Sequence, residues 1–197
     1  GPRHMVETGA QAWLGAVAPD IETDGLPSTD ADFDDLYGAA PDDEDGVVFP
    51  PLVPGSSADI QVTVTDSDGS ACLSGFVDWA GSGTLATLAY TAIDGGGPGG
   101  LLNDVSLAAG PHTISIDVPL AAPRKVAFRF RLTDECSQGG SLATGAAQNG
   151  EVEDYVVALA PLDWGDLPDG PYPTLAHNNG PPHIITGTTH LGARDTH

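Results

Sequence analysis

The sequence predicts an all-β fold, an antiparallel β-sandwich of immunoglobulin-like or jelly-roll-like type, with irregular acidic segments at both ends. Three observations predict it. Short runs of alternating apolar and polar residues recur along the middle of the chain, turn residues separate these runs, and no stretch has a helical period. Strands that follow one another without intervening helices are typical of antiparallel sandwiches.

Five segments carry the clearest strand pattern. Residues 58–65 alternate cleanly, with Ile60, Val62 and Val64 on one face. The other four segments are residues 72–79, 112–118, 125–132 and 151–159, and weaker candidates are residues 47–49, 85–91 and 101–107. In residues 125–132 the apolar side chains are expected to face the core, while the basic ones, Lys125, Arg129 and Arg131, face outward.

The charge of the chain excludes several classes of partner. The formal net charge is −22, with only six lysines and arginines, four of them within residues 124–131. Binding to nucleic acid or to an anionic membrane surface requires a basic footprint, so neither partner is expected. No apolar run is long enough to span a membrane. Such acidity either keeps a protein soluble or binds divalent cations.

The composition divides the chain into four parts. Residues 1–5 (Gly-Pro-Arg-His-Met) read as a cloning scar, residues 6–46 as an acidic connector, residues 47–160 as the sandwich, and residues 161–197 as a second connector. A disordered acidic linker is the alternative for residues 6–46, but apolar residues such as Trp13 and Phe33 interrupt it.

Two short segments near the ends of the chain echo each other. Trp13-Leu14-Gly15-Ala16 reads like His190-Leu191-Gly192-Ala193, at an offset of 177 residues. Repetition at a fixed period is the signature of a tandem array. The chain therefore reads as one period of such an array.

The sequence Gly-Glu-Val-Glu-Asp-Tyr of residues 150–155 is the most specific motif. It precedes the acidic segment 163–169, and residues 74–79 read Ser-Gly-Phe-Val-Asp-Trp. Together these motifs resemble the GEVED domain family, β-modules of large secreted and surface proteins of bacteria. The resemblance implies β-sandwiches that alternate with acidic connectors, a secreted or cell-surface location, and neighbouring repeats of the same protein as head-to-tail partners.

Two cysteines, Cys72 and Cys136, are expected to form a disulfide, since an exported β-domain with two cysteines favours one over two free thiols. Neither cysteine has the spacing of a metal site.

Calcium is the cofactor that the acidic segments favour, because Ca²⁺ takes six to eight oxygen ligands in flexible geometry. The candidate ligands are Asp20, Glu22, Asp24, Asp30, Asp32, Asp34, Asp35, Asp43, Asp45, Glu153, Asp154, Asp163 and Asp166. Glu151 and Glu153 point to the same side of their strand and repel each other. Either calcium or salt bridges to Arg129 and Arg131 could relieve this repulsion.

The predicted function is a calcium-stabilised structural repeat or spacer of a secreted or surface protein, adhesin-like or filament-like. The alternative is a carbohydrate-binding or surface-binding module that uses the loop of residues 80–100, with a glycan as partner. No enzyme is expected, because the sequence has no nucleophile elbow, zinc-protease motif or phosphate loop.

Overall fold

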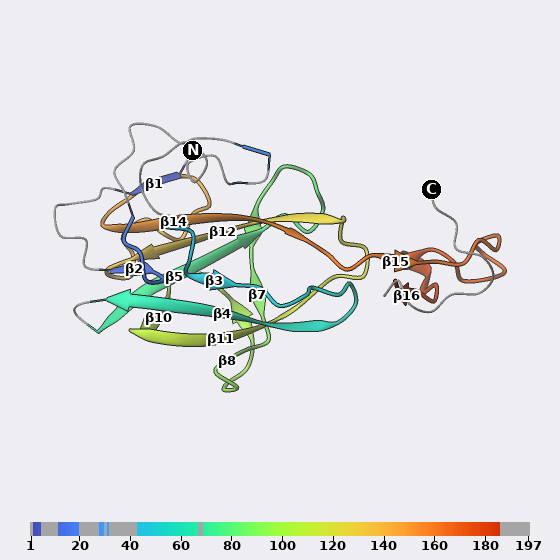
Figure 1. Cartoon of the computed structure of the whole chain (residues 1–197), viewed down its shortest axis with the longest axis horizontal. Helices are drawn as coiled ribbons and strands as arrows, with labels where there is room; N and C mark the ends of the chain where they lie inside the picture. Colours follow the sequence, from blue (N-terminus) through green and yellow to red (C-terminus); the bar gives the residue numbers. More distant parts are fainter. Residues whose placement is uncertain are drawn as a thin grey trace.

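The computed structural model describes residues 2–4, 12–19, 28–29, 31, 43–66 and 69–185, and these form two packed β-sheets (Figure 1). The first sheet has the order β10-β5-β12-β14, with β6 beside β5. Its strands are β5 (Ser70–Val77), β6 (Ala86–Thr87), β10 (Val105–Ala108), β12 (Lys125–Thr133) and β14 (Gly150–Ala158). All of their pairings are antiparallel.

The second sheet has the order β2-β4-β11-β8, with β3 also beside β4, and is antiparallel throughout. Its strands are β2 (Ala12–Leu14), β3 (Val47–Val48), β4 (Ser57–Asp66), β8 (Ala92–Ile93) and β11 (Gly110–Asp117). The predicted all-β sandwich is therefore confirmed.

The core lies between the two sheets and follows the alternation of their strands. Ile60, Val62 and Val64 of β4 are buried, as their spacing predicts. Their counterparts in β12 are also buried, and Phe128 packs edge-on against Trp79 with ring centroids 5.3 Å apart. Burial of apolar side chains contributes about 25 cal/mol per Å² removed from water, so this layer is the main source of stability.

Smaller elements complete the structure. They are β1 (Pro2–His4), which pairs in parallel with β13 (Gly145–Ala147); β7 (Ala89–Tyr90) with β9 (Gly100–Leu101); β15 (Leu162–Asp163) with β16 (His183–Ile184); and the 3₁₀ turn η1 (Ala176–Asn178). The sequence predicts a cloning scar at residues 1–5, but residues 2–4 form a strand. In the part of the chain that the structure describes, no helix is long and apolar enough to cross a membrane.

The tail that follows β14 projects from one end of the sandwich (Figure 1). Its fold is set by Asp169, whose side chain accepts hydrogen bonds from the backbone N–H groups of Thr174 at 2.9 Å and Leu175 at 3.1 Å. These two hydrogen bonds lower the pKa of Asp169, and the one from Thr174 has the larger effect. The tail therefore has local order of its own, although its prolines forbid a regular helix.

Candidate functional site

One edge of β4 carries a strand built from two distant segments. The Cα partners along this edge are Ala12 with Asp66, Trp13 with Thr65, Leu14 with Val64, Val47 with Val62, and Val48 with Gln61. Between them, Gly15 donates its N–H to the carbonyl of Thr63 and Thr63 donates its own to the carbonyl of Gly46, each at 2.9 Å. Gly15 and Gly46 thus both lie opposite Thr63, one residue more than a continuous register would have, and residues 16–45 leave and return at this position.

Two glycines make this junction possible. Gly15 has φ of +71°, and a Cβ there would lie 1.7 Å from Oδ1 of Asp45. A Cβ on Gly46 would lie 2.3 Å from the Cβ of Leu14. Asp45 in turn accepts the N–H of Ala16, at 3.0 Å to Oδ1 and 3.2 Å to Oδ2. The two ends of the acidic segment 16–45 are therefore held together at its base.

Side chains of the GEVED motif hold both segments from the first sheet. Glu151 accepts the N–H of Leu14 on Oε2 at 2.5 Å, and Glu153 accepts the N–H of Gly46 on Oε1 at 2.9 Å. The hydroxyl of Tyr155 donates to Oε2 of Glu153 at 2.9 Å and accepts the first N–H of β3 at 3.1 Å. We call Glu151, Glu153 and Tyr155 the carboxylate clamp.

Burial of the clamp makes its charges costly. Burial, followed by the neighbouring charge of Glu153, raises the pKa of Glu151 to about 9. Burial likewise raises the pKa of Glu153 to about 8, although its two hydrogen-bond donors oppose the shift. Asp43 adds negative charge beside both groups. Oε1 of Glu151 is buried and accepts no hydrogen bond.

The raised pKa values predict a pH dependence of stability. Glu151 and Glu153 bind protons more tightly in the folded chain than in the unfolded one. The stability that these protons contribute is fully present below the unfolded pKa of 4.5, and it is lost as the pH rises through the folded pKa values of about 8 and about 9. The melting temperature should therefore fall across this window in EDTA. Glu151→Gln, which keeps an acceptor for Leu14 but carries no charge, should flatten the fall. The exposed Glu135→Gln should leave the profile unchanged, and an equal effect of the two variants would contradict the assignment.

The structure corrects one prediction about the motif. Glu151 and Glu153 point to the same side of β14, as predicted, but this side is the inner face and not the charged outer face. Of the two alternatives left open for relieving their repulsion, salt bridges from Arg129 and Arg131 to these two glutamates therefore do not form. Arg129 binds Asp154 instead, with Nε 2.6 Å from Oδ1 and Nη2 2.5 Å from Oδ2. Backbone N–H groups, which were not considered as partners, take the place of arginine.

Arg131 differs from its prediction as well. It points away from the core as expected, but the side chain is fully buried instead of reaching solvent. The segment before β13 covers it, and Nη1 donates to the carbonyl of Leu142 at 2.7 Å while Nη2 donates to that of Gly145 at 3.3 Å. A guanidinium has five donors, so one buried arginine can anchor a whole loop to the outer face of the sheet.

The predicted calcium ligands fall into four groups. Asp20, Glu22, Asp24, Asp30, Asp32, Asp34 and Asp35 lie outside the described residues. Asp43 and Asp45 lie at the base of the acidic segment, and Glu153 and Asp154 have the partners given above. Asp163 and Asp166 are exposed in the tail. Among the described residues, no three of these carboxylates come within ligand distance of one another.

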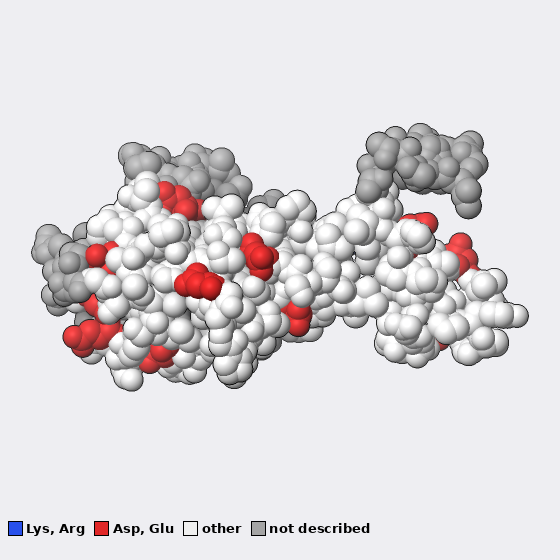
Figure 2. Space-filling model, turned by 90° about the horizontal axis from the view of Figure 1, so that it is seen from below, with Lys and Arg blue, Asp and Glu red and all other residues white. Residues whose placement is uncertain are grey.

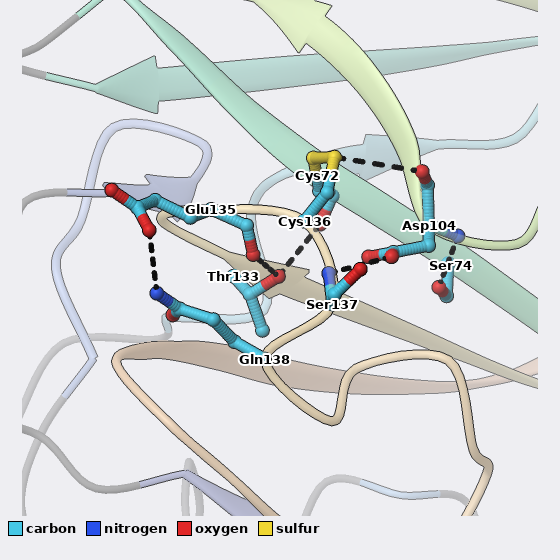
Figure 3. The surroundings of a disulfide bond; sticks show 8 residues. All are labelled: Cys72, Ser74, Asp104, Thr133, Glu135, Cys136, Ser137 and Gln138. Atoms are coloured by element: carbon cyan, nitrogen blue, oxygen red, sulfur yellow. Dashed lines mark hydrogen bonds between the residues drawn. A yellow bond between two sulfur atoms is a disulfide. The ribbon is translucent and has the colours of Figure 1, made fainter.

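The predicted disulfide is confirmed. Cys72 in β5 is bonded to Cys136 in the segment after β12, with Cα atoms 5.2 Å apart (Figure 3). Asp104 lies beside the bond, where its side chain accepts the N–H of Ser137 at 2.7 Å. The three groups of Cys72, Asp104 and Cys136 lie close enough to hold a metal, but both sulfurs are already bonded to each other and offer no thiolate.

The sequence held a signal for the clamp that the prediction did not use. Tyr155, Val157 and Leu159 continue the odd-numbered positions of β14, and all three contribute to the core. The same phase places Glu151 and Glu153 on the inner face. Strand β2 has only three residues, too few for an alternating pattern to identify it.

A comparison with known families matches residues 72–158 to the GEVED domain. The chain contains a GEVED domain. No curated protein matches the chain. The GEVED domain begins at the disulfide and ends with β14, so it includes the clamp. The segments that the clamp holds, β2 and β3, lie outside the matched residues.

Proposed function

We propose that this chain is a structural repeat of a secreted or cell-surface bacterial protein, in which the GEVED domain fixes the base of an acidic segment. One observation carries the proposal. The clamp accepts backbone N–H groups from both ends of residues 16–45, at Leu14 and Gly46. A buried carboxylate with such partners orients backbone instead of a substrate. The domain and the ends of the acidic segment then move as one body.

Two properties support an exported location for such a repeat. The disulfide between Cys72 and Cys136 is of the kind that persists in oxidising compartments. The charge of −22 favours solubility and mutual repulsion at a crowded surface. Figure 2 shows one face with separate acidic side chains and no lysine or arginine. Nucleic acid is therefore not a proposed partner.

Calcium is the proposed ligand of the acidic segment. Residues 16–45 contain eleven carboxylates and no lysine or arginine. At their base, Glu151 has a buried oxygen without a hydrogen bond, and Asp43 adds to the negative charge. The described carboxylates alone do not form a cage, so the proposal depends on residues 20–35. At extracellular calcium concentrations, sites with dissociation constants of about 10⁻⁴ to 10⁻³ M would be largely filled.

Calcium should raise the melting temperature of the chain relative to EDTA. Binding to the native state alone stabilises it by about 2.7 kcal/mol at a hundredfold excess over Kd. Magnesium should have a smaller effect, because it retains its waters and rarely occupies all-protein cages. Thermal melting in calcium, magnesium and EDTA measures this. Coincident curves in calcium and EDTA would contradict the proposal.

The carbohydrate-binding alternative has less support. Trp79, a possible sugar platform, is partly buried and packs against Phe128 of the core. Asp78 closes the start of the 80–100 loop by accepting the N–H of Ser82 at 3.0 Å and of Gly83 at 2.6 Å. A cleft lined by Trp164 measures about 140 Å³, below the roughly 300 Å³ at which ligand pockets begin. Binding in a glycan screen would favour this alternative over a spacer.

A further inference from the structure

The place that β2 occupies on the edge of β4 accepts only a particular five-residue pattern. Its positions are filled by Ala12, Trp13, Leu14, Gly15 and Ala16. The first and third side chains are fully buried, and the second is partly exposed. The third N–H donates to Glu151, and the fifth donates to Asp45. The fourth must be glycine, because of its φ of +71° and the collision of any Cβ with Asp45.

The tail carries a second segment with this pattern. Residues 189–193 read Thr189-His190-Leu191-Gly192-Ala193, and Leu-Gly-Ala occurs nowhere else in the chain besides residues 14–16. His190 would fill the second position, which Trp13 occupies and which is partly exposed. Replacing Trp13 there breaks no side-chain hydrogen bond, because its Nε1 has no partner. Threonine would fill the first, and β-branched residues favour strands. Residues 186–197 themselves lie outside the described part of the chain.

Residues 189–193 cannot take the place of β2 in their own chain. Ile185 donates its N–H to Pro161, which lines one cleft together with Pro54, just ahead of β4. β2 instead pairs with residues 64–66, at the other end of β4, and Figure 1 shows β15 and β2 at opposite ends of the molecule. The ten residues of β4 span about 33 Å. Four residues from Ile185 reach at most about 14 Å, so Thr189 falls well short.

We infer that residues 189–193 are a second copy of the β2 strand, which pairs with β4 of a second copy of this chain. The strand would replace β2 there, donate the N–H of Leu191 to Glu151 and place Gly192 against Asp45. The carboxylate clamp is then the site that receives the neighbouring repeat. This inference rests on the proposed role as a structural repeat, and it names the contact between repeats.

Disulfide trapping tests the pairing. The acceptor chain carries Leu14→Asp, which disables its own β2, and Thr65→Cys, the partner of position 13 in the register. The donor chain carries His190→Cys. The two are mixed in EDTA under mild oxidation, so the result does not depend on calcium. A mixed disulfide between positions 65 and 190 is expected, and it should be lost when the donor also carries Gly192→Val.

Two outcomes would overturn the inference: a folded acceptor that forms no mixed disulfide, or equal trapping by both donors. If Leu14→Asp unfolds the acceptor, a second variant decides. In Ala12→Thr/Trp13→His, the chain's own β2 reads like residues 189–193 and should melt close to the wild type. The control Leu14→Gly/Gly15→Leu, which exchanges two residues of β2, should melt far lower. If Ala12→Thr/Trp13→His melts as low as this control, residues 189–193 are not equivalent to β2 and the inference is overturned. Failure of either test would leave the calcium response of the repeat unaffected.

Discussion

Replacing both cysteines by alanine should lower the free energy of unfolding by about 4 kcal/mol. The Cys72–Cys136 bond closes a loop of 64 residues, and the chain-entropy model gives about this value for loops of such length. The bond also ties β5 to the segment after β12, the central pair of the first sheet. Equilibrium unfolding in urea measures the loss. Wild-type protein treated with a reductant should match Cys72→Ala/Cys136→Ala, and an unchanged free energy in both would contradict the prediction.

Gly46→Ala should cost about 3 kcal/mol, the upper end of the range for overpacked sites. The added Cβ would lie 2.3 Å from the Cβ of Leu14 and 2.8 Å from the backbone N of Gly15, so β2 and β3 must separate. Separation also breaks the hydrogen bond between Gly46 and Glu153. Gly165→Ala is the matched control, since a Cβ there meets no atom within 4 Å. Equal stabilities of the two variants in urea unfolding would show that the junction is not tightly packed.

The long strands were predictable because each buries one face. Alternation in β4 and β12 identifies the core residues, since a shift of one residue would expose all of them. The short strand β2 was not predictable in this way. Its place depends on hydrogen bonds to Glu151 and to β4, which are contacts across fifty or more residues of sequence.

The candidate site was predicted in part. The sequence identified Glu151 and Glu153 as an unusual pair and recognised that something must relieve their repulsion. It did not identify the partners, because backbone N–H groups are present at every residue and leave no trace in the sequence. Arg129 forms its salt bridge with Asp154, whereas salt bridges to Glu151 and Glu153 were one of two alternatives that the sequence left open. Residues 6–46 read as an acidic connector, whereas the two ends of residues 16–45 within it meet at one position of an edge strand.

The most direct test of the account is the calcium response of a chain that lacks residues 16–45, with Gly15 joined to Gly46. β2 and β3 pair with the same strand, and Gly15 and Gly46 both lie opposite Thr63, so their direct join needs only a one-residue bulge and this deletion variant should fold and keep its disulfide. Calcium should raise the melting temperature of the full chain but leave that of the deletion variant unchanged. An unfolded deletion variant would contradict the composite edge strand. A folded one that responds to calcium as the full chain does would contradict the assignment of calcium to the acidic segment.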